Sequence, residues 1–286
     1  MTVGLCTDSN AQMPPELVAR YRVAVVPLTV TVDGEPLLEG EELDADAFYA
    51  RMAASPPPSV STGAPSPGRF LAAYQALADA GADGVLSVHI GSAISGTLNA
   101  ARVAASAAPV PVRLVDTGTA SFAVACCVWE AAEALAAGAD LERAAAVAAD
   151  VAGRTDNVFV VKALDLARAG GRLGRAADEA LTGDAIPVLR LVEGSYQAVA
   201  QVRTVDEAAD AMAGTVLAGA LSGAAPLRVG ISIADAGAAP LWQALEDRLA
   251  GRHEVADLVR YRVGPSVGVH TGPGTAGAMW YPVPST

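Results

Sequence analysis

The sequence is poor in cysteine, aromatic residues and lysine. Its 286 residues include three cysteines, and 5% of them are aromatic. Cys126 and Cys127 are adjacent in an apolar run and Cys6 lies near the start, so the CxxC spacing of redox and zinc sites is absent. An odd number of cysteines, two of them in one helical segment, indicates reduced thiols and predicts a cytoplasmic protein.

Long apolar runs are also missing, although 52% of the residues are hydrophobic. No stretch of about 18 strongly apolar residues is free of charge and glycine, so we predict no transmembrane helix and no stable membrane insertion. The first residues, Met1 to Cys6, lack the basic and apolar segments of a secretion signal. A net charge of −12 argues against nucleic acid or an anionic membrane as the main partner.

The three histidines do not have the spacing of metal ligands. His89, His253 and His270 are far apart in the sequence, so we predict neither a metal nor a cofactor. Spacing alone also assembles no set of catalytic residues. A small-molecule hydrolase that uses Ser95 with a histidine and an aspartate stays as an alternative, although any chain of this length offers such a trio.

What the sequence does contain is a regular alternation of strand and helix patterns over residues 1–152. This alternation favours a mostly parallel sheet with helices on both faces. Further along the chain, hairpins mix with helices, as in the two strand patterns at 186–192 and 196–202 around Glu193-Gly194. We therefore predict an α/β protein with two domains, an N-terminal α/β domain (1–152) and a C-terminal α+β domain (153–286).

The segment from Gly84 to Ala108 organises the N-terminal half. Residues 84–90 have the pattern of a buried strand, residues 98–108 are compatible with a helix, and Gly91 to Thr97 form a loop of small hydroxyl residues and glycines. The backbone N–H groups and helix dipole at such a junction favour an anion. The loop lacks the lysine of a nucleotide P-loop and both glycines of a hydrolase elbow. An anion site and an ordinary tight turn both remain open.

Two segments are dense in proline or glycine. Ser55 to Gly68 holds too much proline for a strand or helix interior, and it is either a linker or a rigid loop laid over a site. Gly264 to Gly274 is rich in glycine, so we expect His270 on a loop that approaches another group closely. Between the two segments, a short helix at 164–169 is expected to stop at Gly170-Gly171.

Several motifs follow one another along nearly the whole chain. They are Thr7-Asp8-Ser9, Val26-Pro27-Leu28, Thr62 to Gly68, Ile94-Ser95-Gly96-Thr97, Val115-Asp116, Arg168-x-Gly170-Gly171-Arg172 and Gly268-x-His270-Thr271-Gly272-Pro273-Gly274. In this order they resemble the DegV family of bacterial fatty-acid-binding proteins. The chain departs from the family pattern at two places, where Gly63-Ala64 replaces Ser-Gln and Ala120-Ser121-Phe122 replaces a common Ser-Met-Gly. These departures bear on which ligand the protein prefers.

The resemblance implies a long-chain fatty acid held in a tunnel between the two domains. It implies that Thr62 and Ser95 bind the carboxylate, that the amide of Gly96 lies beside them, and that His270 lies near the head group. The protein would not be an enzyme, because a separate fatty acid kinase would convert the bound acid to an acyl phosphate. Arg203 would take part in that exchange. The resemblance also leads us to expect a monomer without a cofactor, whose tail (264–286) returns toward the inter-domain site.

Elementary physical chemistry agrees with such a ligand. Each buried methylene contributes about 0.8 kcal/mol, so the tunnel would supply most of the affinity and the head group would fix the register. Hydroxyl and amide donors without an arginine neutralise a carboxylate poorly, so a partly protonated head group is a further hypothesis.

Arg172 is assigned to domain packing rather than to the ligand. Two alternatives accompany the other expectations. In the first, Arg203 merely pairs with Asp206 or Glu207 on the next helix, since such surface pairs are common. In the second, the whole protein acts as a regulatory module that senses a lipid, because the same pocket suits both roles.

Overall fold

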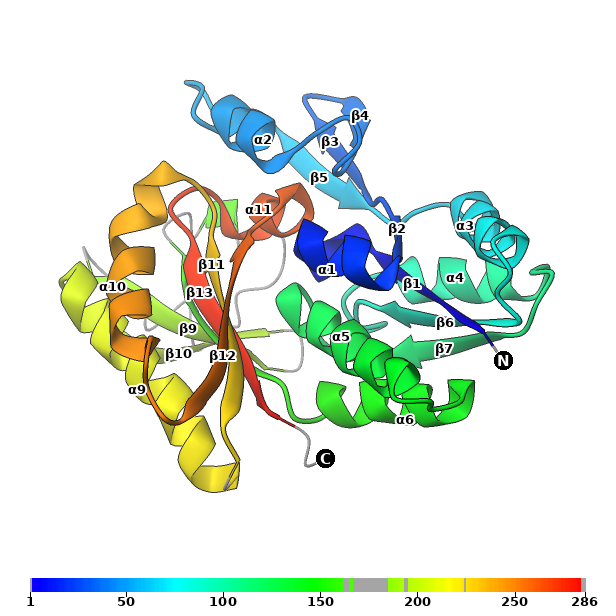
Figure 1. The fold of residues 1–286 in the computed structure, drawn as a ribbon. Helices are drawn as coiled ribbons and strands as arrows, with labels where there is room; N and C mark the ends of the chain where they lie inside the picture. Colours follow the sequence, from blue (N-terminus) through cyan, green and yellow to red (C-terminus); the bar gives the residue numbers. More distant parts are fainter. Residues whose placement is uncertain (1, 162–164, 167–184, 193–194, 224, 284–286) are drawn as a thin grey trace. The chain divides into compact units, whose positions relative to one another are not determined.

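The computed structural model describes residues 2–161, 165–166, 185–192, 195–223 and 225–283. The chain forms two compact units (Figure 1). Unit 1 contains Met1–Leu43 and Ser59–Arg154, and unit 2 contains Asp44–Pro58 and Thr155–Thr286. The segment Asp44–Pro58, which the sequence places in the N-terminal domain, thus groups with the C-terminal part of the chain. Within the described residues, no helix is long and apolar enough to cross a membrane.

Unit 1 is built on a four-stranded parallel sheet with the order β2-β1-β6-β7. Its strands are β1 (Val3–Asp8), β2 (Ala24–Val26), β6 (Gly84–His89) and β7 (Val112–Asp116). Every residue of β6 is buried, as expected of a central apolar strand. The register pairs Thr7 with Val88 and His89 with Asp116, so the carboxyl ends of three strands meet at one edge. Ligand sites of α/β proteins form at such an edge.

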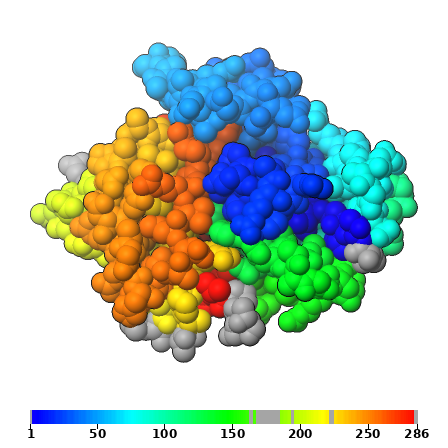
Figure 2. Space-filling model, viewed as in Figure 1, coloured from blue at the N-terminus to red at the C-terminus, as the bar shows by residue number. Residues whose placement is uncertain are grey.

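Helices cover both faces of this sheet (Figure 1). They are α3 (Pro67–Asp79) and α4 (Thr97–Ala105) on one face, and α5 (Phe122–Ala136) and α6 (Leu141–Ala152) on the other. Phe70, Tyr74 and Val85 are fully buried in the core beneath α3 and α4. A further helix, α1 (Pro15–Tyr21), lies at the surface (Figure 2), and its Leu17 is buried in the core. The predicted mostly parallel sheet with helices on both faces is confirmed.

Unit 1 also contains a three-stranded antiparallel sheet with the order β4-β3-β5. Its strands are β3 (Thr29–Val32), β4 (Glu35–Leu38) and β5 (Val60–Gly63). β5 pairs with β3 so that Thr62 lies opposite Val30. The expectation that Ser55 to Gly68 contains no strand is therefore wrong. The prolines at 58 and 65 flank the four residues of β5, whose N–H groups stay available for pairing.

Unit 2 contains a six-stranded mixed sheet with the order β10-β9-β8-β13-β11-β12. Its strands are β8 (Asp156–Val160), β9 (Ile186–Val192), β10 (Ser195–Val202), β11 (Leu227–Ile233), β12 (Val255–Arg262) and β13 (Ala276–Pro282). β9 and β10 form the predicted antiparallel hairpin. The sequence did not indicate β13, which lies between β8 and β11 and is antiparallel to both. Residues 276–282 of the tail thus form an inner strand of unit 2.

Two long helices pack on this sheet and on each other. The described helices of unit 2 are α2 (Ala45–Met52), α9 (Val205–Gly223), α10 (Ala239–Leu249) and α11 (Pro265–Thr271). Met212 of α9, Leu245 of α10 and Ile231 of β11 are fully buried in their common core. α9 starts with a capping box, in which Thr204 Oγ1 accepts the N–H of Glu207 at 3.1 Å and the Glu207 carboxylate accepts the N–H of Thr204 at 3.2 Å.

The short helices α2 and α11 pack closely against each other. A Cβ at Gly268 would lie 2.6 Å from Cε1 of Phe48 and 2.7 Å from the hydroxyl oxygen of Tyr49, so only glycine fits at this contact. The expectation that His270 lies on a glycine-rich loop is wrong, because His270 is in the last turn of α11. The glycine at position 268 is therefore explained by the close packing of two helices and not by a turn of the chain.

Three further expectations fall outside the described ranges. The helix at 164–169 is described only at residues 165–166, and the Glu193-Gly194 turn is not described. The motif from Arg168 to Arg172, with the packing role of Arg172, lies entirely outside these ranges. These expectations stay predictions.

Candidate functional site

Hydrogen bonds join the loops at the carboxyl edge of the parallel sheet in unit 1. The N–H of Gly91, directly after β6 and Ile90, donates to the carbonyl of Thr119 at 2.8 Å. The carbonyl of Gly91 accepts the N–H groups of Ile94 and Ser95 at 2.9 and 3.0 Å, which closes a tight turn. A Cβ at Gly91 would lie only 2.7 Å from the carbonyl carbon of Gly118. The loop is therefore held against its neighbour and places Ser95 just before α4.

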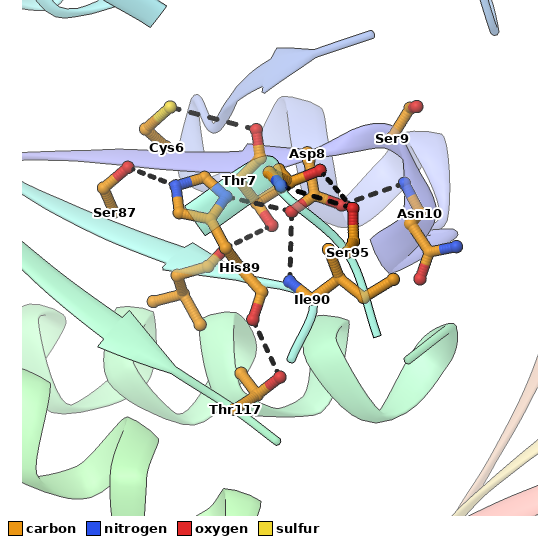
Figure 3. A network of polar contacts seen from close by, with 12 residues as sticks. Cys6, Thr7, Asp8, Ser9, Asn10, Ser87, His89, Ile90, Ser95 and Thr117 are labelled. Carbon is orange, nitrogen blue, oxygen red and sulfur yellow. Dashed lines mark hydrogen bonds and ion pairs between the residues drawn. The ribbon is translucent and has the colours of Figure 1, made fainter. Parts of the chain in front are cut away.

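A buried carboxylate, Asp8, joins the ends of β1 and β6 (Figure 3). Its Oδ2 lies 2.9 Å from Nδ1 of His89 and accepts the N–H of Ile90 at 3.1 Å. Its Oδ1 accepts the N–H of Asn10 at 3.1 Å. The side chains of Asp8 and His89 are 0% exposed, so water does not compete for these bonds. Because Ile90 precedes Gly91, Asp8 fixes the start of the loop that carries Ser95.

The second nitrogen of the His89 ring begins a chain of two buried hydroxyls. Nε2 of His89 lies 2.6 Å from Oγ of Ser87, which lies 2.9 Å from the hydroxyl oxygen of Tyr74. Asp8, His89 and Ser87 thus follow one another as in a Ser-His-Asp triad. All three are fully buried, so a substrate has no access to the Ser87 hydroxyl. Burial also raises the pKa of the nearby Cys6 thiol to about 12, which makes this thiol a poor nucleophile.

Asp116, the last residue of β7, holds the same loop from the other side. Its carboxylate accepts the N–H of Ser92 at 3.0 Å and the N–H of Gly118 at 3.1 Å. Partial burial alone would raise the pKa of Asp116, but these bonds and the Ser92 hydroxyl lower its pKa below the ordinary value. The carboxylate is therefore ionised at neutral pH and acts as an anionic acceptor for two loops.

Ser95 contacts Thr97, the first residue of α4. Oγ of Ser95 accepts the N–H of Thr97 at 3.3 Å and lies 2.8 Å from Oγ1 of Thr97. Ser95 is half-buried, Gly96 is exposed and Thr97 is fully buried. In the part of the chain that the structure describes, no histidine is hydrogen-bonded to Ser95. A hydrolase triad on Ser95 would thus lack a base among these residues.

The segment that follows β5 lies against the loop that carries Ser95. Thr62 is half-buried, and two residues later Ala64 lies beside Gly96. A Cβ built on Gly96 would be 3.9 Å from the Cβ of Ala64, which is an ordinary van der Waals distance. Unit 1 thus places the three predicted carboxylate-binding residues, Thr62, Ser95 and Gly96, on adjacent segments.

The two other predicted site residues belong to unit 2. His270 is half-buried on α11, and Arg203 is exposed between β10 and α9. The guanidinium of Arg203 makes no ion pair with the described residues. Asp206 pairs with Arg248 at 3.3 Å, and the Glu207 carboxylate accepts the backbone N–H of Arg203 at 2.7 Å. The alternative in which the Arg203 side chain pairs with Asp206 or Glu207 is therefore wrong.

Sequence reasoning missed the pair of Asp8 and His89. These residues are 81 positions apart, and neither has a local pattern that points to the other. The available signal was their position at the carboxyl ends of two strands, which are neighbours in the sheet. Among the residues that the structure describes, no group of three His, Cys, Asp or Glu is arranged to hold a metal.

Relatives of this chain cover almost its whole length. The family model described as "Uncharacterised protein, DegV family" matches residues 2–283. A DegV domain-containing protein of Streptomyces coelicolor is 37% identical over 282 residues, which cover 97% of each chain. One from Mycobacterium bovis is 34% identical over 283 residues, which cover 97% of this chain and 96% of the relative.

Solved structures with the same architecture include two that are described as fatty-acid-binding DegV proteins. A DegV family protein from Thermus thermophilus has a TM-score of 0.87 and 32% identity, over 99% of this chain and 100% of that one. A fatty-acid-binding DegV protein from Bacillus subtilis has a TM-score of 0.85 and 25% identity, over 99% of each chain. A family model that spans nearly every residue, together with relatives above 30% identity, shows that this chain belongs to the DegV family.

Proposed function

We propose that this protein binds a long-chain fatty acid and presents its carboxylate to a separate fatty acid kinase. One observation carries the proposal: the hydroxyl of Ser95 and the N–H of Gly96 lie at the carboxyl edge of the parallel sheet, and the hydroxyl of Thr62 is two residues from Ala64, which lies beside Gly96. Hydrogen-bond donors before a helix N-terminus suit a carboxylate. The match to a fatty-acid-binding DegV protein of Thermus thermophilus over the whole chain supports the same ligand.

In this proposal the acyl chain occupies an apolar tunnel between the two domains, and His270 lies near the head group. Burial of each methylene contributes about 0.8 kcal/mol, so the chain supplies most of the affinity and the cradle fixes the position of the carboxylate. The kinase then transfers a phosphoryl group to that carboxylate and forms an acyl phosphate. A binding role without chemistry of its own fits the burial of Ser87, which contacts His89, and of the nearby Cys6 thiol.

Substitution of the two hydroxyl residues tests the proposed cradle. We expect Ser95→Ala and Thr62→Ala each to weaken fatty acid binding by about 1.5–3 kcal/mol, the range for a hydrogen bond to a charged group. The double variant should lose less than the sum, because both hydroxyls contact one carboxylate. Equilibrium titration with a fatty acid measures these changes.

The exposed hydroxyls of Ser61, on β5, and Ser106, directly after α4, give matched controls. Ser61→Ala and Ser106→Ala should bind fatty acid as the unchanged protein does. If Ser95→Ala and Thr62→Ala bind equally well, the carboxylate lies elsewhere.

The exposed guanidinium of Arg203 is the candidate contact to the kinase. Arg203→Ala should keep the fatty acid bound and change the free energy of unfolding by no more than about 0.5 kcal/mol, as surface changes usually do. Acyl phosphate formation with the cognate kinase should nevertheless fall, because the partner or the incoming phosphate loses a cation. Arg252→Ala is the control, since Arg252 is exposed and paired with Glu254 at 2.9 Å. Full kinase turnover by loaded Arg203→Ala protein would rule this role out.

A further inference from the structure

We propose that Thr97 makes the cradle selective for an ionised carboxylate by restricting Ser95 to the role of hydrogen-bond donor. The inference rests on the proposed function, because it assigns the ionisation state of the head group that Ser95 contacts. It also replaces the hypothesis of a partly protonated head group. The role of Ser95 is set by the direction of one hydrogen bond between its hydroxyl and that of Thr97.

Burial decides which of the two hydroxyls donates. Oγ1 of Thr97 and Oγ of Ser95 are 2.8 Å apart, and either atom is chemically able to donate. Thr97 is 0% exposed, and Ser95 Oγ is the acceptor that the described residues offer to its hydroxyl. A buried hydroxyl hydrogen without an acceptor is costly, whereas the half-buried Ser95 directs its own hydrogen elsewhere at little cost. Thr97 therefore donates and Ser95 accepts.

When Thr97 donates, both acceptor positions of the Ser95 hydroxyl oxygen are occupied. Its oxygen has two lone pairs and one hydrogen. One lone pair accepts the Thr97 hydroxyl and the other accepts the Thr97 N–H, at 3.3 Å. Ser95 therefore has its hydroxyl hydrogen left to donate to a ligand. The N–H of Gly96, which has no acceptor within the described part of unit 1, adds a second donor at the same place.

A pair of donors distinguishes between lipid head groups. A carboxylate only accepts hydrogen bonds, and its charge makes each bond about twice as strong as a neutral one. A fatty alcohol or a protonated acid brings a hydrogen of its own, for which Ser95 has no free lone pair. Thr97 is thus a specificity-determining residue that acts through Ser95, and it need not touch the ligand.

The test compares a fatty acid with the primary alcohol of the same chain length. Titration gives both dissociation constants for the unchanged protein, Thr97→Val and Thr97→Ser, at a pH where the free acid is ionised. Valine has nearly the shape of threonine but lacks the hydroxyl, so one lone pair of Ser95 becomes free to accept the alcohol hydrogen. We expect Thr97→Val to reduce the preference for the acid over the alcohol by about two- to tenfold, the factor that corresponds to one new neutral hydrogen bond to the alcohol. Thr97→Ser retains the hydroxyl and should retain the preference.

The outcomes separate this inference from the proposed function. If Thr97→Val leaves the preference for the acid unchanged, whether or not it weakens the binding of both lipids, Thr97 has only a structural role and the inference is overturned. The fatty acid function stands in that case. If the unchanged protein binds neither lipid, the proposed function itself fails. A thermal melt of each variant confirms that the folded protein was titrated.

Discussion

Replacing Asp8 with alanine is expected to lower the free energy of unfolding by at least about 3 kcal/mol, because it leaves three buried hydrogen-bond donors unsatisfied at about 1–3 kcal/mol each. The carboxylate accepts three hydrogen bonds, from the ring of His89 and from the N–H groups of Ile90 and Asn10. Asp8 and His89 are fully buried, so alanine leaves these donors without an acceptor and without water. Fatty acid binding should weaken too, because Ile90 begins the loop that carries Ser95. Denaturant unfolding and lipid titration measure the two effects.

Asp140→Ala is the matched control for this substitution. Asp140 is an exposed aspartate of the same unit and caps α6 by accepting the N–H of Arg143 at 2.8 Å. Loss of a helix cap typically costs about 1 kcal/mol. Asp8→Asn keeps one acceptor oxygen, so its free energy of unfolding should lie between those of the two alanine variants. It provides a folded protein if Asp8→Ala is too unstable to purify. An Asp8→Ala protein as stable as Asp140→Ala would show that Asp8 does not hold the strand ends together.

Gly91→Ala is expected to lose both stability and fatty acid affinity. The added Cβ would lie 2.7 Å from the carbonyl carbon and 2.8 Å from the Cα of Gly118. Both contacts are with backbone, which cannot rotate away as a side chain does, so the loop after β6 must move. Overpacking of this kind costs about 1–3 kcal/mol. Because the displaced loop carries Ser95, we expect the affinity for fatty acid to fall in parallel with the melting temperature.

Gly153→Ala separates this effect from the general consequences of replacing glycine. Gly153 follows α6 in the same unit with φ of −69°, and a Cβ there would meet the carbonyl oxygen of Asp150 at an ordinary 3.6 Å. This variant should unfold and bind lipid as the unchanged protein does. Equal melting temperatures and affinities for Gly91→Ala and Gly153→Ala would contradict the close approach of the two loops.

Local patterns in the sequence predicted most elements of the fold. The strand pattern at 84–90 gave β6, and the hydroxyl-rich loop after it was recognised as a strand-to-helix junction because both neighbours have clear local signals. The hairpin of β9 and β10 followed from two adjacent apolar runs. In each case, the information lies within about ten residues of the chain.

Elements that depend on distant residues were not predictable in this way. The helix α11 contains Gly268. Only glycine fits there, because Phe48 and Tyr49, more than two hundred positions earlier in the chain, lie against it. β5 lies between prolines and exists because β3 offers it a partner. The contact between Asp8 and His89 likewise needs the order of the parallel strands, which no single motif encodes.

The lipid content of the purified protein tests the central claim most directly. Extraction of folded protein with organic solvent, followed by mass spectrometry, identifies any ligand that purifies with it. We predict a long-chain fatty acid in the unchanged protein, and much less of it in the double variant Thr62→Ala/Ser95→Ala, prepared in parallel. Folded protein that carries no fatty acid, and that binds none when fatty acid is added, would contradict the proposed function.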